Sequence, residues 1–177
     1  MQSRHAVAEG PRTRKERKTM GRDFLDAGNF SPKERAILTR AARILEAKVR
    51  AGSVPLNSPA LVREWLALQF SALEREIFGV IYLDAQNRLI EFEALFTGTL
   101  TQTSVYPREV VKAALARNAA AVMVVHNHPS GCAEPSQADQ VLTETLKRAL
   151  ALVDIKVLDH FIVGGSVVLS FAERGLV

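Results

Sequence analysis

The sequence predicts an α/β fold in which a mixed sheet is flanked by helices. Short apolar runs rich in β-branched residues alternate along the chain with segments of helical periodicity. The first two of these runs are separated only by the turn-forming stretch 84–87, so they are expected to form a hairpin. A hairpin among strands that otherwise alternate with helices favours a mixed sheet over a doubly wound parallel one.

The composition indicates a globular protein. The chain has 177 residues, 47% of them hydrophobic, which suits one ordinary domain with a buried core and excludes a wholly disordered protein. Its single cysteine, Cys132, excludes an internal disulfide framework and any cluster of cysteine metal ligands. No apolar run reaches the roughly 18 residues that a membrane span needs, and the N-terminus lacks the apolar core of a secretory signal. We therefore expect a soluble, cytoplasmic protein.

Positive charge is concentrated at the N-terminus. Residues 1–22 hold seven Lys and Arg against two Glu, a net charge of +5, while the rest of the chain holds 16 basic and 17 acidic residues. The segment shows almost no apolar periodicity, so it is expected to be a disordered basic tail. Such a tail can make weak contacts with nucleic acid through phosphate charge alone, and the plainer interpretation is a solvated extension.

Two helices are expected before the first strand. Ser31 and Glu34 have the spacing of a capping box, which predicts a helix over residues 31–50. A second Ser-Pro pair, Ser58–Pro59, begins another helix in the same way. The chain is thus divided into a basic tail over 1–22, a helical N-terminal extension over 23–57 and a main domain over 58–177.

The main domain is expected to alternate strands and helices. Residues 77–83 form a continuous apolar run, which predicts a buried strand, and residues 88–96 predict the returning strand. The sequence then predicts, in chain order, a helix opened by Pro107, a buried strand over 120–125, a helix from Ser136 to about Leu150, and strands over 155–163 and 167–169.

One stretch of the main domain carries the residue types of a metal centre. His126 and His128 lie at the end of an apolar strand, and their spacing places both side chains on the same side of an extended chain. Asp139 lies three residues after Ser136, in the first turn of the next helix, from where its carboxylate can reach back to the strand end. Two histidines and one carboxylate form the ligand set of a catalytic Zn²⁺ site, with the fourth position left for water.

Each of these signals also has a plainer interpretation. A lone His-x-His is more often structural or accidental than metal-binding, and Ser-x-x-Asp is a helix-capping signature by itself. The combination is harder to explain by packing, because two histidines at the polar end of a strand give no packing advantage over Leu or Thr.

The stretch resembles the JAMM motif of the JAB/MPN-type metalloprotease fold, which consists of His-x-His, a spacer and Ser-x-x-Asp, with a Glu on an earlier strand. More specifically, the chain is similar to the bacterial RadC family over about residues 58–177. The similar blocks are, in order, EIFGVIYLD from Glu76, FTGTL from Phe96, VYPREV from Val105, NAAA from Asn118, the stretch 126–139 and DHFIVG from Asp159.

This resemblance implies a JAB/MPN domain with a cytidine-deaminase-like architecture. RadC-like proteins usually carry a helix-hairpin-helix region before this domain. Here only the helix over 31–50 is expected, without a recognisable Gly-containing hairpin, so DNA binding by that element is not expected.

The resemblance also implies a role for each site residue. The two histidines and Asp139 would bind Zn²⁺. Glu76 would act as the general base that takes a proton from the metal-activated water and delivers it to the leaving amine. Ser136 would donate a hydrogen bond to the oxyanion formed on the attacked carbonyl.

Three further residues keep two interpretations each. Glu74 is the alternative to Glu76 as the base, although Glu76 directly abuts the strand. Cys132 lies in the loop between the ligands and either approaches the metal or is a neutral loop residue. His160 is either a group near the site or a packed strand histidine.

Together these inferences predict a zinc-dependent hydrolase of amide or isopeptide bonds, a JAMM-type metallopeptidase that acts on a peptide or protein substrate. The first alternative is a DNA-repair or mobile-element-associated accessory protein without peptidase activity, which the basic tail over 1–22 allows. The second is a catalytically silent MPN scaffold, against which the complete set of three ligands and Glu76 argues.

Overall fold

A five-stranded sheet forms the centre of the described structure. The computed structural model describes residues 31–50, 59–70, 73, 75–98 and 104–177. In chain order the elements are α2 (Pro32–Arg50), α3 (Pro59–Phe70), β1 (Ile77–Leu83), β2 (Leu89–Thr97), α4 (Pro107–Ala116), β3 (Ala121–Asn127), α5 (Gln137–Ala151), β4 (Lys156–Gly164) and β5 (Val167–Ser170).

The sheet is mixed, as the sequence predicts. Its strand order is β2-β1-β3-β4-β5. Strand β1 pairs antiparallel with both β2 and β3, and β5 pairs antiparallel with β4. Only β3 and β4, which are connected through α5, run parallel among the described strands. The hairpin of β1 and β2 is therefore joined to a β-α-β unit in one sheet.

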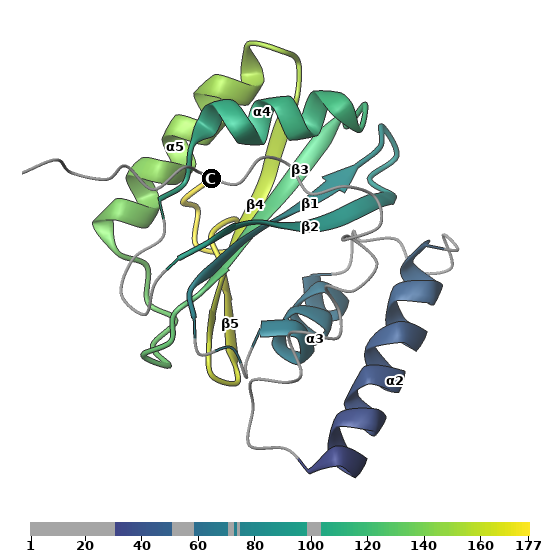
Figure 1. Ribbon diagram of the computed structural model, residues 1–177. Helices are drawn as coiled ribbons and strands as arrows, with labels where there is room; N and C mark the ends of the chain where they lie inside the picture. Colours follow the sequence, from purple (N-terminus) through teal and green to yellow (C-terminus); the bar gives the residue numbers. More distant parts are fainter. Residues whose placement is uncertain (1–30, 51–58, 71–72, 74, 99–103) are drawn as a thin grey trace, which may run out of the picture.

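Helices cover both faces of this sheet (Figure 1). On one face, α4 and α5 contribute Val110, Ala114, Leu146 and Leu150 to a cluster that includes Val80 and Val124 of the sheet. On the other face, α3 contributes Val62, Trp65, Leu66 and Phe70 to a cluster that includes Ile81 and Val125. Because successive strand residues face opposite sides, β1 and β3 must be apolar at nearly every position. This requirement explains the continuous apolar run over 77–83.

Local sequence signals set the helix starts that were predicted. At the start of α2, Ser31 N donates to a Glu34 carboxylate oxygen at 2.7 Å, and Glu34 N donates to Ser31 Oγ at 3.4 Å. At the start of α5, Ser136 and Asp139 make the same reciprocal pair of bonds. Both capping boxes satisfy backbone N–H groups that the first turn of a helix leaves without partners.

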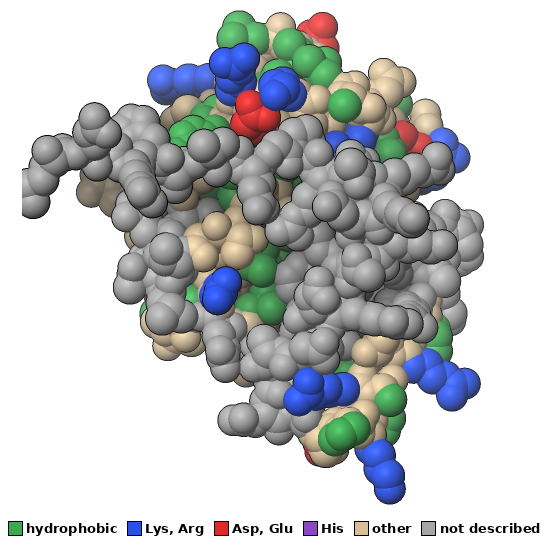
Figure 2. All heavy atoms as spheres, in the orientation of Figure 1, with side chains coloured by type: hydrophobic (Ala, Val, Ile, Leu, Met, Phe, Trp, Pro, Cys, Tyr) green, Lys and Arg blue, Asp and Glu red, His purple; other side chains and the backbone are tan. Residues whose placement is uncertain are grey.

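The outer surface of the α4 and α5 layer carries both charged and apolar side chains, with Leu115 on α4 and Val141 on α5 exposed. Charged side chains of both signs lie over these two helices (Figure 2), and they include the ion pairs Lys112–Glu109 on α4 and Arg148–Glu144 on α5. In the described part of the chain, no helix has both the length and the apolar character that crossing a membrane requires.

Candidate metal centre

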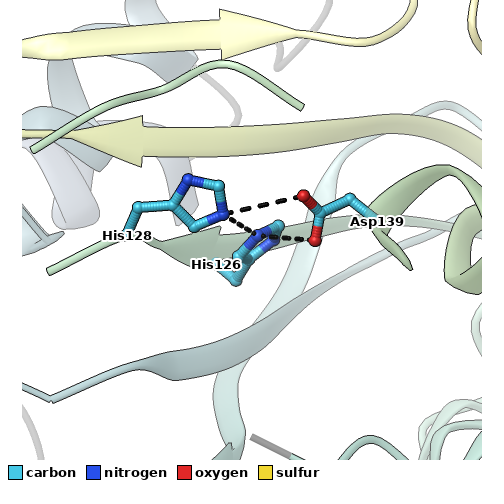
Figure 3. Close-up of side chains that lie close together, drawn as sticks. All are labelled: His126, His128 and Asp139. Atoms are coloured by element: carbon cyan, nitrogen blue, oxygen red, sulfur yellow. Dashed lines mark hydrogen bonds and ion pairs between the residues drawn. The ribbon is translucent and has the colours of Figure 1, made fainter. Parts of the chain in front are cut away.

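The two predicted histidine ligands and the predicted carboxylate converge at the end of β3 (Figure 3). His126 Nε2 lies 2.9 Å from His128 Nε2. One carboxylate oxygen of Asp139, Oδ1, lies 3.2 Å from His126 Nε2, and the other, Oδ2, lies 3.6 Å from His128 Nε2. The sequence places Asp139 more than ten residues beyond the histidines, and the loop and the first turn of α5 return it to them.

These spacings fit a zinc ion. Ligand atoms that lie 2.0–2.1 Å from a tetrahedral Zn²⁺ are about 3.3 Å apart. The two Nε2 atoms lie 2.9 Å apart, and the nearest Asp139 oxygens lie 3.2 Å (Oδ1 to His126) and 3.6 Å (Oδ2 to His128) from them, on either side of that span. Two imidazole nitrogens and one carboxylate oxygen are also a donor set that Zn²⁺ takes in catalytic sites. The residues present therefore fit the metal that the sequence predicts.

Strand alternation decides which way His126 points. Its neighbours Val122 and Val124 on the same face of β3 pack against α4 and α5. His126 therefore faces the layer that contains α5, which carries Asp139. Only 2% of the surface of His126 is exposed, so the first ligand is held inside the fold.

The loop after β3 holds the second ligand. His128 N donates to Val163 O at 2.8 Å, which extends the pairing of β3 with β4 by one bond beyond the strand end. The chain then turns back, with Gly131 at φ +80°, a left-handed conformation that glycine adopts without steric cost. The turn brings Cys132 O to 2.7 Å from His128 Nδ1. Because a carbonyl only accepts, Nδ1 carries the proton and Nε2 keeps its lone pair for a metal.

The electrostatics of the site favour a cation. Burial opposes ionisation of Asp139, but its contacts with the imidazoles of His126 and His128 and the hydrogen bond from Ser136 outweigh it and hold the pKa of this carboxyl far below its usual range. The hydrogen bond with Asp139 raises the pKa of His128 above its ordinary value, against the effect of burial. An ionised carboxylate that faces two imidazoles is the arrangement a bound metal ion would complete.

Glu76 lies beside His128, immediately before β1. Phe78 pairs with His126 in the β1–β3 ladder, so continuing this register by two residues brings Glu76 opposite His128. The negative charge of Glu76 contributes to the raised pKa of His128. Glu76 is partly exposed, and its carbonyl accepts a hydrogen bond from Gly98 N at 2.8 Å. Glu74, the alternative base, lies outside the described residues.

Ser136 lies next to the ligands as the N-cap of α5. Its hydroxyl donates to Asp139 Oδ2 at 2.7 Å, and its backbone N–H donates to the same oxygen at 2.8 Å. The residue thus orients the carboxylate and leaves Oδ1 directed at His126. The exposed Cys132 takes part through its backbone carbonyl, as described above.

Sequence reasoning left His160 with two interpretations, and the structure places it directly behind His126. His160 is fully buried on β4, and its Nε2 lies 2.8 Å from His126 Nδ1. Its other nitrogen, Nδ1, lies 2.6 Å from Thr143 Oγ1 on α5. Burial lowers the pKa of His160 well below its ordinary value.

Nothing in the sequence analysis indicates a role for Thr143 or Asn127, which both lie near the site. Thr143 lies one helical turn after Asp139, and only the fold brings its hydroxyl to His160. Asn127, between the two histidines, points to the opposite face of the sheet and contacts the segment that leads into β1. The strand alternation that pairs the histidines is the one signal that could have assigned Asn127 to that face.

Comparison with known proteins identifies the family of this chain. A family model described as the RadC-like JAB domain matches residues 56–176. A UPF0758 protein of Dechloromonas aromatica is 62% identical over 140 residues, which cover 78% of this chain and 61% of the relative. A UPF0758 protein of Leptothrix cholodnii is 59% identical over 141 residues, which cover 80% of this chain and 63% of the relative. The UPF0758 protein YkfG of Escherichia coli K12 is 55% identical over 149 residues, which cover 84% of this chain and 94% of the relative.

The matched part of the chain spans less than two thirds of the length of the first two of these relatives. The names of the relatives state no activity, so the comparisons establish kinship and leave the reaction to be argued from the site. Because the family match covers more than half of the sequence and these relatives share more than half of their aligned residues with it, the chain belongs to the RadC-like JAB domain family.

Proposed function

We propose that this chain is a zinc-dependent hydrolase of amide or isopeptide bonds. The observation that carries the proposal is the convergence of His126 Nε2, His128 Nε2 and the nearest oxygens of an ionised Asp139 within 3.6 Å, with Glu76 near enough for its charge to raise the pKa of His128. This arrangement provides three protein ligands and a neighbouring carboxylate that is not one of them. A catalytic zinc site needs these parts and a position for water.

The three ligands would hold Zn²⁺, which supplies Lewis acidity and lowers the pKa of a water molecule to about 7 in favourable sites. Each histidine is prepared for this role by a contact at its Nδ1, from His160 for His126 and from Cys132 O for His128. Asp139 is prepared by its two hydrogen bonds from Ser136. Ligands held in this way bind a metal without rearranging, which increases affinity.

Glu76 would move the proton in both halves of the reaction. Its carboxylate accepts a proton from the attacking water as the water oxygen bonds to the substrate carbonyl carbon. It then returns that proton to the amide nitrogen as the C–N bond breaks, so the products are a carboxylic acid and an amine. The partial exposure of Glu76 leaves it accessible to water and substrate.

Ser136 would donate its hydroxyl proton to the oxyanion that develops on the substrate carbonyl. Its Oγ–H is directed at Asp139 in this structure. When the hydroxyl turns to the substrate, the backbone N–H of Ser136 still holds Asp139 Oδ2. The carboxylate therefore keeps one anchoring bond during the reaction.

The proposal is tested by cleavage of a peptide library and of isopeptide-linked peptides with the full chain loaded with zinc. Glu76→Gln keeps the shape of the side chain but does not accept the proton, so turnover is expected to fall by about 10²–10⁴-fold. Its zinc content is expected to stay unchanged, because Glu76 is not a ligand. Glu144→Gln, on the exposed side of α5, is the matched control and should leave both unchanged.

Full activity in Glu76→Gln would contradict the role of Glu76, and Glu74→Gln would then test the alternative base. Full activity in chain freed of metal would contradict the zinc-dependent reaction itself. The alternative function, a DNA-associated accessory protein, rests on the charge of +5 in residues 1–22. It would be favoured by DNA retention that depends on this tail together with no metal-dependent cleavage of any substrate.

A further inference from the structure

A buried chain of hydrogen bonds joins two of the ligands on the side away from the proposed metal position. His126 Nδ1 lies 2.8 Å from His160 Nε2, and His160 Nδ1 lies 2.6 Å from Thr143 Oγ1. Thr143 Oγ1 in turn lies 2.6 Å from Asp139 O. The path begins at one ligand on β3, passes through β4, and ends at the backbone of another ligand on α5.

The direction of each hydrogen bond follows from the final bond of the chain, between Thr143 Oγ1 and Asp139 O. Asp139 O is a carbonyl and only accepts, so the single hydroxyl proton of Thr143 is donated to it. The Thr143 oxygen must therefore accept from His160, which places the proton of the neutral His160 ring on Nδ1. His160 Nε2 then has only a lone pair, and it accepts from His126 Nδ1–H.

This ordering determines the chemistry of the first ligand. In its neutral form an imidazole carries one proton, and the contact with His160 places that proton of His126 on Nδ1. Its Nε2 therefore presents a lone pair toward His128 and Asp139, as a metal ligand requires. The opposite ordering would place a proton on His126 Nε2 and block binding at that atom.

We propose that His160 and Thr143 are positioning residues that hold His126 in the Nδ1–H form and tie it to the helix that carries Asp139. The inference rests on the metal site of the proposed function and extends it to two residues outside the ligand set. Neither residue touches the metal position, and both act through His126.

A role in packing alone has a different signature. His160 is surrounded by aromatic rings, with its ring centroid 4.7 Å from that of Phe171 and 6.0 Å from that of Phe78. If only the bulk of the ring mattered, removing the hydroxyl of Thr143 would change stability without changing which nitrogen of His126 is protonated. The location of that proton therefore separates the two roles.

The experiment compares Thr143→Val, which removes the hydroxyl at nearly constant shape, with Thr143→Ser, which keeps it. Long-range ¹⁵N–¹H spectra of the metal-free full chain report the protonated nitrogen of each histidine, and competition with a chelator measures the zinc affinity. Thr145→Val is the matched control, because Thr145 makes the same bond to the carbonyl one turn earlier, with Thr145 Oγ1 2.7 Å from Val141 O, on the exposed side of α5.

In the wild type, in Thr143→Ser and in Thr145→Val, His126 is expected to carry its proton on Nδ1 and to bind zinc equally well. In Thr143→Val, His160 loses its acceptor and is expected to move its proton to Nε2, which drives the His126 proton to its own Nε2. Loss of such a supporting contact is expected to weaken zinc binding by about 10- to 100-fold.

A folded Thr143→Val that keeps both the wild-type proton position and the wild-type zinc affinity would overturn the proposal. Thr143→Ala provides the same test if the valine variant does not fold. A wild-type chain that binds no zinc would contradict the proposed function instead. In that case the spectra of the metal-free chains still decide whether Thr143 sets the proton position in His126.

Discussion

The side-chain oxygen of Asn127 accepts a hydrogen bond from the backbone N–H of Ile77 at 2.8 Å. Asn127 Nδ2 also donates to Arg75 O at 3.0 Å, so one buried amide binds the chain on both sides of Glu76. Asn127 itself lies between the two histidine ligands. The strand that carries His126 therefore also fixes the segment that carries the proposed base.

This relationship predicts the effect of Asn127→Leu. The substitution leaves Ile77 N–H buried without its acceptor, which should lower the free energy of unfolding by about 1–3 kcal/mol. Turnover should fall because Glu76 loses its support, while zinc content should persist. Asn127→Asp, which keeps the acceptor for Ile77 but donates nothing to Arg75 O, should be intermediate. Unfolding in urea and metal analysis measure these quantities, and an unchanged rate in a folded Asn127→Leu would refute the link.

Zinc itself provides the most direct prediction. Protein purified without chelator should contain about one Zn²⁺ per chain, as the three-ligand pattern requires. The double variant His126→Ala, His128→Ala should lose most of the metal, because two of the three ligand atoms are gone. His5→Ala, in the basic tail, is the control for a histidine outside the site. Full zinc content in the double variant, by elemental analysis, would exclude this site.

Gly164 should tolerate no side chain, because the loop after β3, which holds His128, lies against it. A Cβ built at this position would stand 2.5 Å from Ala133 N and 2.6 Å from the carbonyl carbon of Cys132. In Gly164→Ala the loop must move, at a cost of about 1–3 kcal/mol in stability. Because Cys132 O supports His128, zinc affinity should fall as well.

The control for this variant is Gly165→Asn. Gly165 has φ +57°, which Asn tolerates better than other side chains, and no heavy atom lies within 4 Å of its built Cβ. Thermal unfolding and chelator competition should show little change in this variant. If Gly164→Ala bound zinc as tightly as the wild type, the loop contact would not be what positions His128.

A pH dependence is expected from Asp159, which is buried on β4 and bonded to Ser170 of β5. Burial raises its pKa above the ordinary value of 3.8, and hydrogen bonds from Ser170 Oγ, Ala172 N and His160 N only partly offset this effect. The folded chain thus holds the Asp159 proton more tightly than the unfolded chain does. The stabilising contribution is complete below pH 3.8 and is lost as the pH rises through the raised pKa of the folded state.

Asp159→Asn removes this titration. Urea unfolding at a series of pH values should show the wild type losing stability relative to Asp159→Asn as the pH rises from the ordinary carboxyl range toward neutrality. Asp154→Asn, in the exposed turn before β4, is the control for removal of a carboxylate. A difference between wild type and Asp159→Asn that does not change with pH would show that the Asp159 carboxyl is ionised with equal ease in both states.

The basic tail yields a prediction about nucleic acid. Because residues 1–22 carry the whole positive excess, any affinity for DNA should be weak, insensitive to sequence and strongly reduced by salt. A chain that starts at Gly21 should lose this affinity and keep its zinc content. Tight DNA binding by the truncated chain at high salt would locate the binding surface in the rest of the molecule.

Much of the fold could be predicted because its signals are local. The run over 77–83 coincides with β1, and the predicted returning strand over 88–96 differs from β2 by one residue at each end. The capping pair of Ser136 and Asp139 marks the start of α5 from four neighbouring residues. The predicted strand 120–125 is too short, because β3 continues to His126 by pairing with β1 and to Asn127 by pairing with β4, and both strands lie elsewhere in the sequence.

The three candidate ligands can also be predicted from local signals, but the residues that hold them in place cannot. Strand alternation places His126 and His128 on one side, and a helix start places a carboxylate within reach. The partner of His126 Nδ1 is 34 residues away on a different strand, and the amide that braces β1 is 50 residues from Ile77. No spacing in the sequence marks such pairs.

The sequence by itself determined the mixed α/β fold class, the position of most elements and the three residues that converge as candidate ligands, because periodicity, capping and strand alternation act over a few residues. Only the tertiary structure decided that His160 and Thr143 form a chain of hydrogen bonds with His126. It also decided that Asn127 bonds to the segment around Glu76, and that the loop after β3 packs closely against Gly164. The physical reason is that hydrogen-bond direction and close packing depend on which surfaces meet when the sheet and helices assemble.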